Sequence, residues 1–268
     1  MLEKKSMQFM LNVPLLDSTI LSTINKKLTE TFGNEFSEVI IGGAALNPEA
    51  EEFFKKIGFR FTVGYGMTEC APLISHSFWH EFKLHSVGKV LPTMEAKILS
   101  NDPQNEVGEI IVRGENVMLG YYKNEEATRL AIDEDGWLHT GDMGTMDYDG
   151  TIYIKGRNKN MLLGPSGQNI YPEEIENKLN NMPFVLESLV LQNAENKLVA
   201  LVVPDYDAMD EAKLTTKDLE MVMEENRKAL NATTAAYESI TKVQIYPSEF
   251  EKTPKKSIKR FLYINQLK

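Results

Sequence analysis

The segment GYGMTEC at residues 64–70 places three chemically different side chains next to one another. Glycines on both sides of Tyr65 let the backbone turn tightly and allow a ligand to approach it closely. Tyr65, Thr68 and Glu69 then offer an aromatic face, a hydroxyl and a carboxylate. These groups suit stacking on a base, hydrogen bonding to a phosphate and holding Mg²⁺. An ordinary strand-to-loop turn with a buried tyrosine explains the same residues equally well, so both interpretations stay open at this point.

The segment GWLHTGD at residues 136–142 supplies a second carboxylate. Asp142 is predicted to end a loop, where a carboxylate can accept hydrogen bonds from the two vicinal hydroxyls of a ribose. Taken alone, a turn aspartate is the simpler explanation.

A third segment, GRNKNMLLGPSGQNIYPEEIE at residues 156–176, is basic and rich in glycine. Arg157 and Lys159 fall at a predicted domain boundary, where a few backbone torsions could swing one domain against the other. Gly164 and Gly167 add flexibility or allow close approach of a ligand. The alternative is a solvated basic linker.

The elements before these segments read as a layered α/β piece. Apolar residues recur at helical spacing over 16–32, and Val39-Ile40-Ile41 is a short buried-strand pattern. Asn47-Pro48 predicts the start of a second helix that ends at Gly58. Residues 59–63 alternate as a strand and lead directly into the Tyr65 loop, so the glycine loops follow strand ends.

The rest of the chain divides into a β-rich region and a small α+β module. Short β runs separated by turn sequences predict strands over 95–99, 109–114 and 151–155. After residue 156, a helix start at Tyr171-Pro172, two strands, a helix over about 216–230 and a last strand follow. We therefore predict a first domain over 1–156, with an α/β piece at 1–86 and a β-rich subdomain at 87–156, and a second domain over 157–268.

Composition excludes several classes of protein. The 268 residues carry 29 Lys and Arg against 39 Asp and Glu, a net charge of −10, and 42% of them are hydrophobic. Such a chain builds a core and is not a general nucleic-acid binder. The single cysteine, Cys70, excludes a disulfide scaffold, apolar runs are too short to span a bilayer, and no signal peptide is predicted. We expect a soluble, cytoplasmic protein.

Generic motifs for nucleotide or metal binding are absent. The sequence contains neither a GxxxxGK phosphate loop nor a GxGxxG fingerprint, and its four histidines lack HExxH spacing. Asp147-Tyr-Asp149-Gly lacks the remaining ligands of a calcium loop, so it is predicted to form a turn.

Five ordered motifs, however, resemble those of the adenylate-forming, AMP-binding superfamily. They are GGAAL at 42–46, GYGMTE at 64–69, GEIIVRG at 108–114, GWLHTGD at 136–142 and the segment 156–176. Within that superfamily the chain looks most like long-chain fatty acid–CoA ligases, and the resemblance covers almost the whole chain. The fold it implies is part of a large N-terminal adenylation domain followed by a small, mobile C-terminal domain.

The resemblance implies a role for each matching residue. The Gly43, Ala44 and Ala45 loop and the Tyr65-Gly66 loop would form the adenine pocket, with Tyr65 stacked on the base. Thr68 would contact the α-phosphate and Glu69 would help hold Mg²⁺. Asp142 and Arg157 would bind the ribose, Lys159 falls at the family's hinge, and Gly167 would approach the thiol of coenzyme A.

The reaction implied has two steps. A fatty carboxylate attacks the α-phosphate of ATP to give acyl-AMP and pyrophosphate, and coenzyme A then displaces AMP. The first step needs charge neutralisation on the phosphates, hence cations and Mg²⁺.

Two departures from the family pattern affect this expectation. The family's phosphate loop and most of its acyl-binding region belong upstream of residue 42 and are absent, so we expect a C-terminal fragment that lacks the N-terminal portion of its own chain. The fragment is expected to be inactive alone. In EKTPKKSIKR at 251–260, Ser257 stands where the family usually has a catalytic lysine. Either Lys256 takes that role by a one-residue shift, or adenylation relies on other cations. The alternative is that the segment is a solvated basic tail.

Two other functions remain open. One is an enzyme that transfers the acyl group to a carrier protein instead of coenzyme A, and the other is a non-catalytic nucleotide-binding module. Apolar surface left by missing neighbours would promote association. The alternative is that the same surface is a docking face for a membrane or an acyl carrier.

Overall fold

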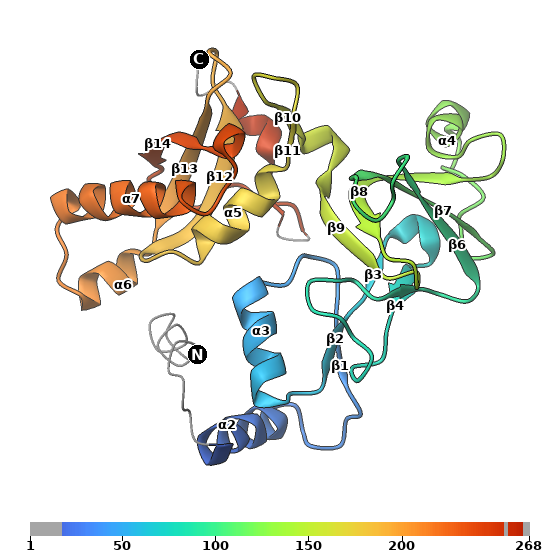
Figure 1. The fold of residues 1–268 in the computed structure, drawn as a ribbon, viewed down its shortest axis with the longest axis horizontal. Coiled ribbons are helices and arrows are strands. Elements are labelled where there is room, and N and C mark those ends of the chain that lie inside the picture. Colours follow the sequence, from blue (N-terminus) through green and yellow to red (C-terminus); the bar gives the residue numbers. More distant parts are fainter. Residues whose placement is uncertain (1–17, 255–256, 265–268) are drawn as a thin grey trace. The chain divides into compact units, whose positions relative to one another are not determined.

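The computed structural model describes residues 18–254 and 257–264 (Figure 1). The chain divides into two compact units, the first ending at Asn158 and the second beginning at Lys159. Within the described part, no helix has both the length and the apolar character needed to cross a membrane.

Unit 1 begins with the predicted α/β piece. Its elements are α2 (Ser18–Thr31), β1 (Val39–Ile41), α3 (Pro48–Ile57) and β2 (Phe61–Val63). The start of α3 is confirmed: the Asn47 side chain accepts hydrogen bonds from the amides of Glu49 and Ala50, and Pro48 is the first helical residue. Phe53 and Ile57 of α3 pack on Phe61 and Val63.

Strands β1 and β2 are parallel, with Val39 opposite Phe61 and Ile41 opposite Val63. Parallel strands in one sheet end at the same edge, so the loops that follow them meet there. The amide of Gly64 donates a 2.9 Å hydrogen bond to the carbonyl of Ile41. The two glycine-containing loops, which start at Gly42 and Gly64, are therefore held side by side.

The rest of unit 1 is antiparallel sheet and one short helix. A three-stranded sheet has β3 (Tyr65–Gly66), β4 (Leu73–His76) and β5 (Lys89–Val90). A four-stranded sheet has β6 (Met94–Leu99), β7 (Gly108–Gly114), β8 (Leu138–Met146) and β9 (Ile152–Arg157), with α4 (Glu125–Ala131) between β7 and β8. Tyr65, Ile74, Ile110, Leu138 and Ile152 share its core.

The prediction that Asp142 ends a loop is wrong, because Asp142 lies inside β8. The strand is interrupted there by a bulge: Glu109 pairs with Met143 and Ile111 pairs with His139, so residues 140–142 face the single residue Ile110. The bulge contains a left-handed residue, Gly141 at φ +71°, a backbone conformation that favours glycine.

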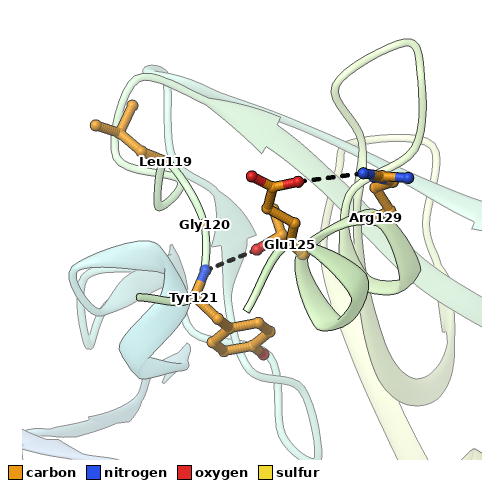
Figure 2. Close-up of a pocket in the computed structure, with 6 residues that line it drawn as sticks. Leu119, Gly120, Tyr121, Glu125 and Arg129 are labelled. Atoms are coloured by element: carbon orange, nitrogen blue, oxygen red, sulfur yellow. Dashed lines mark hydrogen bonds and ion pairs between the residues drawn. The ribbon is translucent and has the colours of Figure 1, made fainter. Parts of the chain in front are cut away.

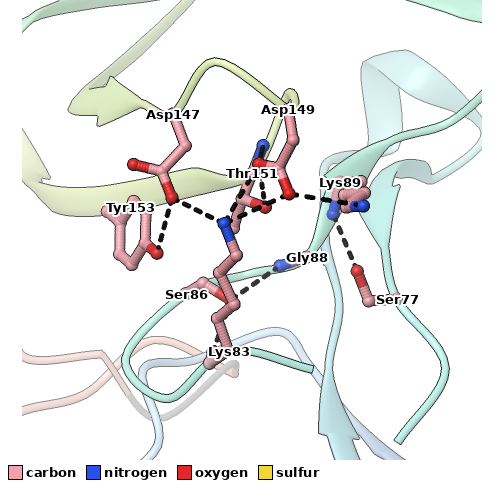
Figure 3. Close-up of polar contacts among 9 residues, drawn as sticks. All are labelled: Ser77, Lys83, Ser86, Gly88, Lys89, Asp147, Asp149, Thr151 and Tyr153. Carbon is pink, nitrogen blue, oxygen red and sulfur yellow. Dashed lines mark hydrogen bonds and ion pairs between the residues drawn. The ribbon is translucent and has the colours of Figure 1, made fainter. Parts of the chain in front are cut away.

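The turn between β8 and β9 forms ion pairs with two lysines, one before β5 and one in it (Figure 3). The ammonium of Lys83 lies 2.8 Å from Asp147 and 3.1 Å from Asp149, and that of Lys89 lies 3.3 Å from Asp149. The Thr151 hydroxyl and these lysines lower the pKa of Asp149. The two aspartates thus serve as turn residues and lysine partners.

Unit 2 contains a sheet of three strands with helices on one face (Figure 1) and a separate antiparallel pair of short strands, β10 and β11. The order β12-β13-β14 is antiparallel and then parallel. Its elements are β10 (Leu162–Leu163), β11 (Asn169–Ile170), α5 (Pro172–Asn180), β12 (Val185–Gln192), β13 (Leu198–Pro204), α6 (Tyr206–Glu211), α7 (Thr216–Asn231) and β14 (Ile240–Ile245).

The central strand β13 is buried on both faces, which explains its uninterrupted apolar sequence. Leu198, Ala200 and Val202 face the core under α5 and α7. Leu201 and Val203 face a second core, which the C-terminal residues Phe250 and Tyr263 cover.

A buried ion pair fixes the C-terminal segment to this sheet. Arg260 pairs with Glu176 of α5 and donates a 3.1 Å hydrogen bond to the carbonyl of Val190. The other oxygen of Glu176 accepts a 2.6 Å hydrogen bond from the Val190 amide. Burial raises the pKa of Glu176 to about 7, while Arg260 and the amide act in the opposite direction.

We expect Arg260→Met to lower the free energy of opening of β12 by about 3 kcal/mol at pH 8, because it leaves a buried carboxylate unpaired. Amide hydrogen exchange of β12 measures this. The control is Lys197→Met, which breaks an exposed pair with Glu195 and should cost less than about 1 kcal/mol. Equal effects of the two substitutions would contradict the prediction.

Candidate functional site

Three of the predicted site residues meet at the carboxylate of Asp142 in unit 1. One of its oxygens accepts a 2.7 Å hydrogen bond from the Tyr65 hydroxyl, and the other lies 3.1 Å from Nε of Arg157. Asp142 and Tyr65 are each only 7% exposed, whereas Arg157 is exposed. Burial and the charge of Asp142 raise the pKa of Tyr65, so its phenol stays protonated and can donate. A carboxylate has about four lone-pair positions, so this one retains acceptor capacity for further donors.

Sheet geometry brings these side chains together. Asp142 and Arg157 are directly opposite each other in the β8–β9 pair. Tyr65 comes from β3, 77 residues earlier in the chain than Asp142. In the bulge, the Thr140 hydroxyl accepts from the Asp142 amide at 3.1 Å and donates to the Ile110 carbonyl at 2.7 Å.

The glycine loops offer backbone that a ligand can approach. Gly43, Ala44, Ala45 and Gly66 are all exposed. Gly66 has to be glycine, because a Cβ there would overlap the carbonyl of Pro72. Tyr65 differs from these residues: its ring belongs to the core, and its hydroxyl serves Asp142. Its stacking on a base stays a prediction.

Thr68 and Glu69 lie in one short 3-10 helix after this loop. Thr68 is exposed, and Glu69 is half-buried. One oxygen of Glu69 accepts a 3.0 Å hydrogen bond from the Tyr121 hydroxyl, and its carbonyl accepts from the Met118 amide at 2.7 Å. Glu69 therefore has a fixed position with one carboxylate oxygen left for other contacts.

A depression of about 410 Å³ lies next to Tyr121 (Figure 2). Gly120, Thr128 and the ion pair of Glu125 with Arg129 line it, and the Tyr121 amide donates to Thr128 at 2.9 Å. None of the predicted site residues lines this depression, so we assign it no role in the site.

The residues present could hold a magnesium ion through one carboxylate, provided that phosphates of the substrate and water supply the other ligands. Among the described residues, no group of three or more His, Cys, Asp or Glu side chains is placed to hold a metal. Mg²⁺ is commonly held by one or two carboxylates together with substrate phosphates and water. A single carboxylate, Glu69, beside an exposed hydroxyl is compatible with that arrangement.

The remaining predicted residues belong to unit 2 or fall outside the description. Lys159 is exposed in a 3-10 helix, and Gly167 is at the exposed tip of the β10–β11 hairpin. Ser257 is exposed, and its carbonyl accepts a 2.8 Å hydrogen bond from the Thr253 amide. Lys256 lies outside the described residues.

Sequence reasoning missed three supporting residues: Glu109, Thr140 and Tyr121. Glu109 and Thr140 were inside motifs that had been noted, but no role was considered for them. Tyr121 precedes Asn124, the N-cap of α4, whose acidic first turn of Glu125 and Glu126 is the one signal that could have drawn attention to this region.

Two family models match the chain. The AMP-binding enzyme family matches residues 1–122, and the AMP-binding enzyme C-terminal domain matches residues 160–268. Together they cover most of the sequence. Asp142, Arg157 and Lys159 lie between the two matches.

Known proteins similar to the chain are larger than it. The long-chain-fatty-acid–CoA ligase FadD15 of Mycobacterium bovis is 30% identical over an alignment of 256 residues, which covers 88% of this chain and 42% of that protein. The long-chain-fatty-acid–CoA ligase ACSBG1 of Rattus norvegicus is 33% identical over 162 residues, 60% of this chain and 22% of that protein. The chain thus spans less than half the length of these relatives.

The fold is also that of a solved acyl-adenylate complex. The o-succinylbenzoate CoA synthetase MenE of Bacillus subtilis, in complex with its acyl-adenylate intermediate, superposes with a TM-score of 0.72 at 26% identity. The match covers 90% of this chain and 49% of MenE. The mixed α/β and α+β fold class expected from the sequence is confirmed.

We expect Tyr65→Phe to lower the free energy of unfolding of unit 1 by about 1–2 kcal/mol, because buried Asp142 loses a donor. Denaturant titration followed by tryptophan fluorescence measures it, since Trp79 and Trp137 both lie in this unit. Tyr148→Phe is the control, because Tyr148 is 93% exposed, and its effect should stay within about 0.5 kcal/mol. A Tyr65→Phe effect no larger than the control would refute a stabilising role for the hydrogen bond.

Proposed function

Since the chain belongs to the AMP-binding, adenylate-forming enzyme family, we propose that its unit 1 binds the adenosine monophosphate moiety of ATP and of an acyl-adenylate. The chain is proposed to be part of a fatty acid–CoA ligase, which agrees with the names of the relatives FadD15 and ACSBG1. A long-chain fatty acid is the proposed acyl substrate.

The observation that supports nucleotide binding most directly is the Asp142 carboxylate. Tyr65 and Arg157 fix both of its oxygens in one orientation, at 2.7 and 3.1 Å. A buried, oriented carboxylate can accept hydrogen bonds from the two ribose hydroxyls without reorganising, and preorganisation of this kind strengthens binding. The neighbouring glycine loops, at the carboxyl ends of β1 and β2, are where open α/β sheets bind ligands.

Each site residue has a task in the proposed reaction. In the first step, a carboxylate oxygen of the fatty acid bonds to the α-phosphorus of ATP, and pyrophosphate leaves. Thr68 would donate a hydrogen bond to the α-phosphate, and Asp142 and Arg157 would hold the ribose. Magnesium bound through Glu69 would neutralise phosphate charge. In the second step, the sulfur of coenzyme A bonds to the acyl carbon and AMP leaves, with Gly167 close to the thiol.

A second candidate is a nucleotide-binding module without adenylation activity, and Ser257 favours it. A serine hydroxyl cannot place a positive charge next to an anionic transition state. In this case the adenosine monophosphate site would remain while the chemical step would be lost. An acceptor thiol on a carrier protein, in place of coenzyme A, is a third candidate that the same site would serve.

We expect the chain to bind AMP and Asp142→Ala to weaken that binding at least tenfold, about 1.4 kcal/mol, because the ribose hydroxyls lose their acceptor. Isothermal titration calorimetry measures both affinities. Asp135→Ala removes an exposed carboxylate from the turn before β8 and is the matched control. Equal AMP affinity in all three proteins would reject the proposed ribose site.

We expect the 268-residue chain to show no ATP–pyrophosphate exchange above background, because the sequence lacks the family's phosphate loop. Exchange of radiolabelled pyrophosphate into ATP in the presence of a long-chain fatty acid measures the first step. A full-length fatty acid–CoA ligase is the positive control. Exchange by the chain at the rate of that enzyme would refute the assignment of the missing loop to this step.

A further inference from the structure

We propose that Glu109 is a positioning residue that holds the bulge of β8 in the conformation that aims Asp142 at a ribose. The proposal rests on the proposed function, since it assumes that Asp142 binds the ribose hydroxyls. Glu109 is on β7, next to the bulge, and is not among the residues assigned to the nucleotide.

The carboxylate of Glu109 contacts two residues of the bulged region of β8. One oxygen accepts a 3.0 Å hydrogen bond from the Gly141 amide, and the other lies 2.9 Å from Nδ1 of His139. These two contacts lie on either side of Thr140 and directly before Asp142. His139 is held from its other nitrogen as well, 3.8 Å from a carboxylate oxygen of Asp133.

The Gly141 amide depends on this contact because of the strand geometry. Between the Glu109–Met143 and Ile111–His139 pairs, three residues of β8 face one residue of β7. A bulge removes regular ladder partners, and a backbone amide without a partner costs free energy when it is shielded from water. The Glu109 side chain supplies that partner from the neighbouring strand.

The conformation that Glu109 stabilises is also the one that orients Asp142. Gly141 adopts φ +71°, and a change in its torsions would rotate the peptide that leads into Asp142. Thr140 fixes the Asp142 amide at 3.1 Å, and Glu109 fixes the amide one residue earlier. Two consecutive amides of the bulge are therefore hydrogen-bonded to side chains, and these bonds fix the backbone from which the Asp142 side chain projects.

The Glu109 carboxylate itself has little access to a ligand. Its side chain is 19% exposed, and both oxygens have partners within the bulge. A role that acts through Asp142 explains this arrangement, whereas direct contact with a nucleotide does not.

The test compares AMP with 2′,3′-dideoxyadenosine monophosphate, which lacks both ribose hydroxyls. Isothermal titration calorimetry gives the affinity ratio of the two nucleotides for the wild-type chain, Glu109→Ala and Glu109→Gln. We expect Glu109→Ala to reduce the preference for AMP at least fivefold while binding of the dideoxy nucleotide changes little. Glu109→Gln, whose amide oxygen can still accept from Gly141, should retain more of the preference than Glu109→Ala.

Glu95→Ala is the matched control, because Glu95 lies in the same sheet but pairs with Arg113, away from the bulge. It should leave the preference unchanged. An equal loss of affinity for both nucleotides in Glu109→Ala would overturn the proposal, since a general structural defect acts on both. If Glu109→Ala does not fold, Glu109→Met replaces it, because methionine keeps the length of the side chain but cannot accept a hydrogen bond from the Gly141 amide as a carboxylate does. An unchanged AMP preference in Glu109→Met then overturns the proposal, and a reduced preference with faster hydrogen exchange at Gly141 supports it.

The test separates the two hypotheses. A wild-type chain that binds both nucleotides equally well would reject the ribose site itself. A wild-type preference for AMP that survives in Glu109→Ala would reject only the positioning role.

Discussion

A carboxylate buried in a protein has to be hydrogen-bonded, and in unit 1 the bonds that satisfy Asp142 also connect three separate parts of the fold. The Tyr65 hydroxyl comes from β3, Arg157 comes from β9, and Thr140 links the Asp142 amide to β7. Since the two donors, Tyr65 and Arg157, lie on β3 and β9, both contacts form only when the two antiparallel sheets that contain these strands are packed together. This part of the candidate site therefore depends on the packing of these sheets against each other.

The parallel pair contributes the second constraint. Its strands are only three residues long, yet they are enough to fix Ile41 and Val63 in register, and the hydrogen bond from Gly64 to Ile41 continues that register into the loops. Glycine is needed where the loops approach other backbone, as at Gly66 beside Pro72. The exposed loop residues Gly43, Ala44 and Ala45 are thus presented at a defined edge, although they make no side-chain contacts of the kind that hold Asp142.

Elements with strong local signals were predicted from the sequence, and those that depend on pairing were not. The cap at Asn47, the proline at the start of α3 and the apolar run of β13 are local or periodic features, and the structure contains all three elements. The bulge around Gly141 has no comparable signal, because a glycine after a threonine fits a loop as well as an interrupted strand. The partnership of Glu109 with Gly141 could not be predicted, since it depends on how β7 and β8 align. The motif order, in contrast, pointed to the family through residues that are far apart in the sequence.

The ion pairs of the C-terminal segment in unit 2 determine which of its cations are available for chemistry. Three described cations of the C-terminal segment have carboxylate partners. Lys252 lies 2.8 Å from Glu187, Lys259 lies 3.3 Å from Glu251, and Arg260 pairs with buried Glu176. Moving Arg260 toward a phosphate would leave Glu176 without its partner in the interior, which is costly. Lys259 is tied more loosely, since Glu251 is largely exposed and such pairs are weak. The exposed Ser257 brings no charge at all. If this segment supplies a positive charge to an α-phosphate, Lys259 could do so at little cost, and so could the neighbouring lysines at 255 and 256. The one-residue shift to Lys256 is therefore a simpler hypothesis than a rearrangement of Arg260.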